Sequence, residues 1–170
     1  MRADPARWRR RLLTLPLYLT AACLGAVLLP AVLLCTLAAD VATASRLAWS
    51  RAALFGMVYL LCEAAGILIG GLLWVLKPLL SEAGFVAANH TLQHRWSQAL
   101  LHAMVGIFQL KLEVDGVEAL SGGPLVLLVR HASMIDTVLP MHLVTVPNRY
   151  RARYVLKAEL LWDPCLDIVG

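Results

Sequence analysis

Charged residues are scarce in this chain. Asp, Glu, Lys and Arg together make up 15% of the 170 residues, whereas hydrophobic residues make up 60%. The mean hydropathy is +0.73. Soluble domains carry about 25% charged residues, so this composition excludes an ordinary soluble protein and indicates a membrane protein.

Cysteine is also scarce, and its spacing excludes two kinds of site. No two of the four cysteines form a C-x-x-C pair, so neither a disulfide framework nor a cysteine zinc site is predicted. His90 and His94 have the spacing of zinc ligands on a helix, but Gln93 stands where a zinc protease needs Glu. We therefore expect no metal. The basic residues lie near apolar segments, where they favour anionic lipid, and nothing indicates nucleic acid.

Two apolar runs dominate the amino-terminal half. Residues 12–39 carry no charge, and residues 52–76 carry one, Glu63. Each run can cross a hydrocarbon core of about 30 Å at a rise of about 1.5 Å per residue. Glu63 costs about 3 kcal/mol at mid-membrane, and the apolar residues offset this with about 5 kcal/mol. We expect Glu63 to be neutral or paired with the other span, in a structural or a functional role.

Basic residues predict how these runs are oriented. Five arginines precede the first run, and the loop between the runs has only Arg46 and Arg51. The positive-inside rule therefore predicts a cytoplasmic amino terminus (1–11) and a two-helix anchor (12–76) in the cell (inner) membrane, which returns the chain to the cytoplasm. A signal peptide cleaved near residues 42–44 is the alternative, although the first run is longer than a usual signal sequence.

The remainder is predicted to be a linker (77–86) and a cytoplasmic domain (87–170). Apolar residues recur every three or four positions over 87–110, which predicts an amphipathic helix that packs against a sheet or lies on the bilayer. Alternating polar and apolar residues at 111–115 and apolar stretches at 124–129 and 154–156 predict strands, and 135–144 predicts a helix. The expected fold class is α/β, with an incomplete parallel βαβ core.

His131 and Asp136 are the strongest candidates for catalysis. They lie five positions apart after the predicted strand 124–129, at the edge of the sheet where open α/β sheets bind ligands. Ser133 and Asp136 fit a capping box, which would turn the chain between the histidine and the aspartate and let the two side chains meet. A carboxylate beside an imidazole orients the ring and stabilises its cation. The structural alternative is a capped helix preceded by a histidine with no catalytic role.

A second block strengthens the catalytic interpretation. The H-x-x-x-x-D motif at 131–136 is followed by Lys157-Ala158-Glu159-Leu160, Pro164 and Gly170. Together they resemble the lysophospholipid acyltransferase family, which includes 1-acylglycerol-3-phosphate acyltransferases, over roughly residues 88–170.

The resemblance implies catalytic roles for His131 and Asp136. It implies substrate contacts for Arg130, Ser133, Lys157 and Glu159. It also implies membrane lipids as partners, a lysophospholipid acceptor, and acyl-coenzyme A or acyl-carrier protein as co-substrate, with no other cofactor.

The chain departs from the family pattern in two places. Arg130 stands where family members often have Asn, and the family's later blocks, which bind the acceptor's phosphate, are absent from these 170 residues. The chain therefore resembles the first part of the enzyme. The alternative is an inactive membrane-anchored protein that binds lipid or a partner.

Overall fold

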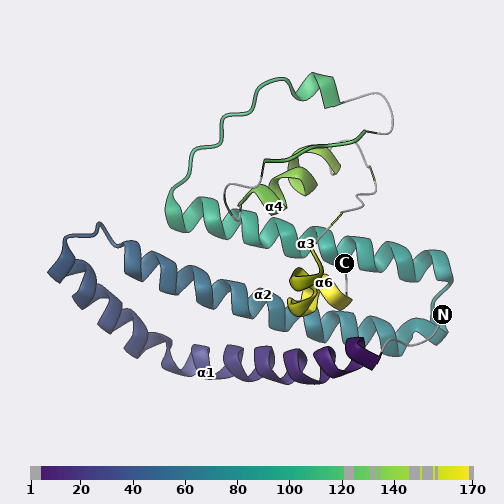
Figure 1. Ribbon diagram of the computed structural model, residues 1–170, viewed down its shortest axis with the longest axis horizontal. Helices are drawn as coiled ribbons and strands as arrows, with labels where there is room; N and C mark the ends of the chain where they lie inside the picture. Colours follow the sequence, from purple (N-terminus) through teal and green to yellow (C-terminus); the bar gives the residue numbers. More distant parts are fainter. Residues whose placement is uncertain are drawn as a thin grey trace.

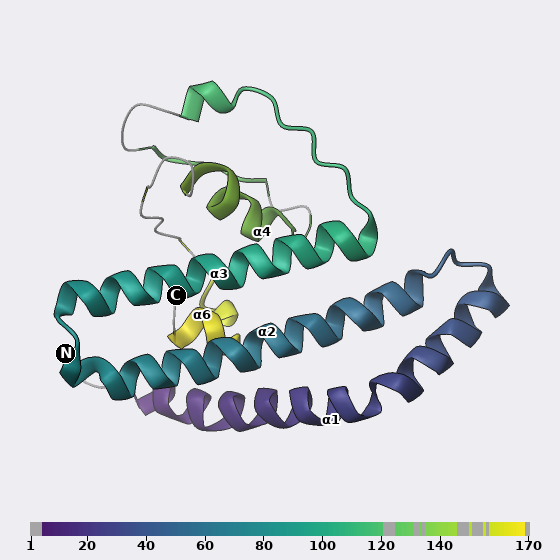
Figure 2. The same ribbon diagram turned by 180° about the vertical axis from the view of Figure 1, so that it is seen from behind.

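The computed structural model describes residues 5–120, 125–130, 133, 135–145, 150, 155 and 157–168. In chain order the helical elements are α1 (Pro5–Thr43), α2 (Ala48–Leu76), η1 (Lys77–Leu79), α3 (Glu82–Phe108), η2 (Val117–Leu120), α4 (Ile135–Pro140), η3 (Met141–Thr145), η4 (Ala158–Trp162) and α6 (Pro164–Ile168). Figures 1 and 2 show α1, α2 and α3 as three rows with α2 in the middle. α4 lies on the far side of α3.

α1 and α2 form an antiparallel hairpin with a tight turn. Three turn residues that are not glycine have φ between 51° and 66°: Ala44, Arg46 and Leu47. The buried Asp40 carboxylate stabilises this turn, since it accepts hydrogen bonds from Trp49 N at 3.0 Å, Ser50 N at 2.9 Å, Ser50 Oγ at 2.6 Å and the Ser45 hydroxyl. These bonds satisfy amides of the first turn of α2, which otherwise have no partner.

Among the residues that the structure describes, two helical segments are long and apolar enough to cross a membrane, Arg7–Thr43 and Ala48–Leu79. The prediction of two such segments is confirmed. Large apolar side chains are exposed along the whole of α1: Leu12, Leu13, Leu17, Leu24, Val27, Leu28, Val32, Leu34, Leu37 and Val41. A continuous apolar surface of this extent is unfavourable in water and suits a bilayer.

α3 covers the face of α2 opposite α1. It begins five residues before the predicted position, because Ser81 Oγ accepts from Gly84 N at 3.1 Å and caps the helix at Glu82. The predicted apolar positions Leu92, Leu100 and Met104 are buried. α3 packs against α2 and α4, and the described residues contain no sheet for it to cover.

The α/β prediction is wrong. The described residues contain helices, turns and irregular segments but no β-strand. Residues 111–115 and 125–129, predicted as strands, are irregular. Of the third predicted strand, 154–156, only Val155 is described, and it is fully exposed at 105%.

The segment 125–129 shows the physical reason for this error. The exposed fractions of its side chains run 43%, 91%, 43%, 92% and 46% along the chain. That alternation is the period of an extended backbone, in which successive side chains point to opposite sides. A strand also needs a neighbour that exchanges backbone hydrogen bonds with it, and no described segment pairs with this one. The apolar sequence of this segment therefore correctly indicated an extended backbone, but it could not indicate whether a neighbouring strand would pair with it.

The described core is helical. Leu100, Leu101 and Met104 of α3 are buried together with Val138 of α4. Side chains of α2 pack against this group from the other side: Phe55, Tyr59 and Cys62. α3 therefore links the membrane-type hairpin to the part of the chain that carries the acyltransferase-like motif.

Candidate active site

The described part of the predicted catalytic motif is the start of α4. Ser133 N donates to Asp136 Oδ2 at 2.7 Å, and Asp136 N donates to the Ser133 carbonyl at 3.3 Å. The first bond is the return bond of a capping box, in which an acid in the first turn accepts from the amide of the capping residue. The structure therefore has Asp136 in the first turn of a helix that begins after Ser133, as the sequence predicts.

α4 is a short helix that α3 holds in place. Val138 is 5% exposed and belongs to the core with Leu100, Leu101 and Met104. Asp136 is two residues from this buried contact, so its backbone is tied to a packed element.

The other predicted site residues are distributed differently. His131 lies outside the described residues. Arg130 is exposed on an irregular segment, and Lys157 and Glu159 are exposed at the start of η4. The structure brings Ser133 and Asp136 together. Neither the Lys157 nor the Glu159 side chain forms a hydrogen bond or ion pair with another residue that the structure describes.

The structure also contains a polar cluster that the sequence did not reveal. It ties the helix α6 to α1 and α2 and extends to α3 through Glu63, and we call it the anchor cluster. Its members are Arg10, Arg11, Tyr59, Glu63, Trp96, Asp163, Cys165 and Asp167.

Glu63 is the centre of the anchor cluster. It is fully buried at 0% exposure in the middle of α2. Its Oε1 accepts from Trp96 Nε1 on α3 at 3.0 Å, and its Oε2 accepts from Cys165 N on α6 at 3.2 Å. Of the two alternatives for Glu63, a neutral group or a pairing with the first span, the pairing is wrong. The donors to Glu63 come from α3 and α6 and not from α1. Two donors reduce the cost of burying a carboxyl group in this place.

Asp163 makes the second link between α6 and α2. Its Oδ2 accepts from the Tyr59 hydroxyl at 2.5 Å, and its Oδ1 accepts from Leu166 N at 3.0 Å. The second bond caps α6, whose first residue is Pro164, and this is the position where the fixed φ of proline costs least. One carboxylate thus starts the helix and attaches it to the hairpin.

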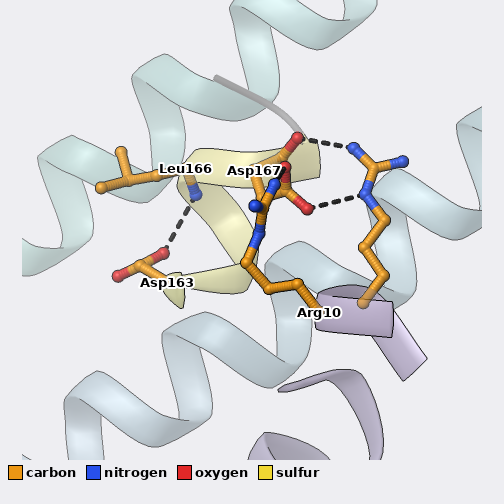
Figure 3. A network of polar contacts seen from close by, with 5 residues as sticks. Arg10, Asp163, Leu166 and Asp167 are labelled. Carbon is orange, nitrogen blue, oxygen red and sulfur yellow. Dashed lines mark hydrogen bonds and ion pairs between the residues drawn. The ribbon is translucent and has the colours of Figure 1, made fainter. Parts of the chain in front are cut away.

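Asp167 makes the third link, to the start of α1 (Figure 3). Its carboxylate accepts from Arg10 Nη2 at 2.8 Å and from Arg11 Nε at 2.7 Å, and its carbonyl accepts from Arg11 Nη2 at 2.7 Å. Burial by itself would raise the pKa of Asp167, but the hydrogen bonds from Arg11 and Arg10 outweigh it and hold the pKa below its ordinary value. Asp167 is therefore an ionised carboxylate at neutral pH.

Cys165 fits tightly against α2. A Cβ atom at Gly66 would lie 2.3 Å from Cys165 Sγ, so only glycine allows this approach. Burial, and then the charge of Glu63, raise the pKa of the Cys165 thiol. The thiol is neutral and inaccessible, which makes it a packing group and not a nucleophile.

The contacts of the anchor cluster are structural, since they hold α6 in place. Its three carboxylates are each engaged by specific donors, and its sulfur is buried. Its effect on function is indirect. It fixes residues 163–168, which belong to the acyltransferase-like block, against the hairpin.

Histidines form a third group, between α3 and η3. The rings of His102 and His142 have centroids 6.1 Å apart, and His142 Nδ1 is buried with no hydrogen-bond partner among the described residues. Burial, followed by the charges of His142 and Arg95, lowers the pKa of His94. Across the described part of the chain, no three His, Cys, Asp or Glu side chains are placed to hold a metal ion.

One local signal pointed to the anchor cluster. The sequence Asp163-Pro164, an N-cap residue followed by a proline, is typical of a helix start. Glu63 is a single acid in an apolar helix, where an acid is usually paired. The pairing itself could not be predicted, since Glu63 and Cys165 are 102 residues apart and Arg10 and Asp167 are 157 apart.

Comparisons with protein families, with curated proteins and with solved structures gave no match to this chain.

Proposed function

We propose that this protein is a membrane-bound O-acyltransferase. It would move a fatty acyl group from acyl-coenzyme A or acyl-carrier protein to the hydroxyl of a lysophospholipid such as 1-acylglycerol-3-phosphate. The observation that carries the proposal is the 2.7 Å bond between Ser133 N and Asp136 Oδ2. This bond supports a turn of the chain between His131 and Asp136, which the H-x-x-x-x-D motif requires. The choice of acyl transfer as the reaction rests on the resemblance to lysophospholipid acyltransferases.

His131 would act as the general base. An alcohol is a weak nucleophile at neutral pH, and a positioned base accelerates its attack by about 10²- to 10⁴-fold. The imidazole takes the hydroxyl proton while the oxygen attacks the thioester carbonyl. The new ester bond forms, the carbon–sulfur bond breaks, and the imidazolium returns the proton to the leaving thiolate. No acyl-enzyme is formed, because the acceptor is itself the nucleophile.

Asp136 would orient this imidazole. An ionised carboxylate has about four acceptor positions on its two oxygens, so capping α4 leaves capacity for a histidine N–H. The carboxylate would then select the tautomer of His131 and stabilise its cation. The capping interpretation and the catalytic interpretation of Asp136 are therefore compatible.

Exposed cations would bind the phosphate of the acceptor or of coenzyme A. Arg130 and Lys157 are exposed, and a guanidinium or ammonium group is a strong donor to phosphate oxygens. In this proposal Ser133 positions the substrate or caps α4, and Glu159 contacts the substrate.

The hairpin would anchor this chain in the inner membrane, with the Lys77 end of α2 on the cytoplasmic side. α1 and α2 are antiparallel, so the arginine-rich start of α1 and the end of α2 at Lys77 lie at the same end of the molecule (Figure 1). The positive-inside rule assigns that end to the cytoplasm. The lipid acceptor then reaches the site from the bilayer without passing through water.

The test is acyl transfer by membranes that contain the whole chain. With radiolabelled acyl-coenzyme A or acyl-carrier protein and a panel of lysophospholipids, His131→Ala should lower the rate by about 10²- to 10⁴-fold. Asp136→Asn keeps an oxygen that can accept from Ser133 N, so it should lower the rate while α4 stays folded. His90→Ala, on α3, is the matched control and should keep the wild-type rate.

The alternative is a membrane-anchored protein that binds lipid or a partner without catalysis. It predicts that wild-type membranes transfer no acyl group from either carrier while the purified chain still retains lysophospholipid. Near-normal transfer by His131→Ala would also contradict the assignment of the base.

A further inference from the structure

The corner between α2 and α3 contains an open cavity of about 420 Å³. It is lined by Lys77, Leu80, Glu82, Phe85 and Val86. Ligand sites have volumes of about 300–1,000 Å³, so the cavity can hold a group of modest size. The second apolar segment ends here, at Leu79. The cavity is therefore at the depth where a bilayer presents its headgroups.

Two opposite charges line this cavity without pairing. Within the described part of the chain, neither Lys77 nor Glu82 forms an ion pair, with the other or with any other residue. Lys77 Nζ lies 5.3 Å from the ring centroids of both Trp74 and Phe85. The two rings hold the ammonium group in place and leave its N–H donors for an anion.

We propose that this cavity binds the headgroup of a zwitterionic phospholipid that has a primary ammonium group, as phosphatidylethanolamine has. The phosphate pairs with Lys77, and the lipid ammonium donates to the Glu82 carboxylate. Leu80 and Val86 contact the glycerol and the start of the acyl chains. One cation and one anion in the same cavity match a headgroup that has one of each.

The aromatic pair sets the selectivity among headgroups. A choline headgroup is recognised by an aromatic cage, but the Trp74 and Phe85 rings already hold the Lys77 ammonium. A trimethylammonium group also has no N–H to donate to Glu82. A glycerol headgroup satisfies Lys77 and leaves the Glu82 carboxylate without a cation. The ethanolamine headgroup satisfies both.

The neighbouring surface accommodates the rest of the lipid. Val75 is 75% exposed and Leu79 is 83% exposed on the segment that forms the cavity wall. Trp74 is 51% exposed, as is usual for tryptophan at the boundary between hydrocarbon and headgroups. A bound lipid would therefore extend its chains along the end of α2.

The experiment measures which lipid the whole chain retains. The protein is placed in nanodiscs with equal amounts of phosphatidylethanolamine, phosphatidylcholine and phosphatidylglycerol of identical acyl chains, and bound lipid is counted by native mass spectrometry. We expect wild type to retain the ethanolamine lipid about tenfold over each of the others, which corresponds to about 1.4 kcal/mol. Glu82→Gln should reduce this preference to within about twofold. Ser81 caps α3 through Gly84 N, so the variant keeps its helix start.

Three further variants complete the test. Lys77→Gln should lower retention of all three lipids, and Val86→Trp, which fills the cavity, should abolish the preference even if Glu82→Gln fails to fold. Glu113→Gln changes an exposed acid outside the cavity and should behave as wild type. Equal retention of the three lipids by wild type, or an unchanged preference in Glu82→Gln or Val86→Trp, would overturn the proposal. Loss of acyl transfer alone would not, since the cavity is separate from Asp136.

Discussion

Glu63 and Gly66 lie three residues apart on α2, and both face Cys165. The Glu63 carboxylate accepts from Cys165 N, and the missing side chain of Gly66 makes room for Cys165 Sγ. In the sequence, Glu63 suggested a pairing with the first span. A pairing implies that this face of α2 is buried, as it is, but the prediction missed α6, which covers it.

Substitution at Gly66 tests the docking of α6. Gly66→Ala would place Cβ 2.3 Å from Cys165 Sγ, so α6 has to shift away from α2. Overpacking of this kind costs about 1–3 kcal/mol. Unfolding in detergent should show this loss. Gly71→Ala on the same helix is the matched control, because nothing lies within 4 Å of its Cβ position. A combined Gly66→Ala, Cys165→Ala chain should recover most of the stability, and no recovery would mean that the sulfur is not the obstacle.

Elements with local signals were predicted well. Apolar positions at helical spacing predicted α3, and its buried face includes Leu92, Leu100 and Met104. The cap at Ser133 predicted the start of α4. Segment 125–129 was predicted as a strand because its composition and period suit one, but pairing depends on a neighbour that the local sequence does not specify. Short elements such as α6 depend even more on distant residues, since three carboxylates attach it to α1 and α2.

The ion pairs of Asp167 predict how the docking of α6 responds to pH. The pKa of Asp167 is lowered in the folded state, so its contribution is complete above the ordinary pKa of about 3.9 and is lost as the pH falls through the folded value. Asp167→Asn should lower the free energy of unfolding by about 2 kcal/mol at pH 7. The difference from wild type should shrink toward pH 3. Asp115→Asn, at an exposed position after α3, should show no such difference at either pH.

On the scale of the whole molecule, the structure has two unlike sides. α1 presents apolar side chains along its length, and the opposite side carries α3 and α4 (Figure 2). Composition and the two apolar runs predicted the first side. The arrangement of α3 beside α2 was not predicted, since the sequence favoured packing of residues 87–110 on a sheet, with the bilayer surface as the alternative.

Cysteine labelling tests the proposed orientation. In right-side-out vesicles a membrane-impermeant maleimide should label Thr43→Cys, at the end of α1, and should not reach Ala83→Cys, an exposed position at the start of α3, until the vesicles are opened. The native cysteines are a suitable background, because Cys23, Cys35 and Cys62 lie within the apolar helices and Cys165 is buried. Labelling of both introduced cysteines from the same side would show that the hairpin does not cross the membrane.

The distance along the chain between Glu63 and Cys165 has a consequence for biogenesis. Their hydrogen bond joins residues 102 positions apart. At a synthesis rate of about 5–20 residues per second, α2 leaves the ribosome about 5–20 s before α6 does. During that interval the carboxyl group of Glu63 enters the insertion machinery without its final partner, and a nascent chain that stalls in this window would expose it to quality control.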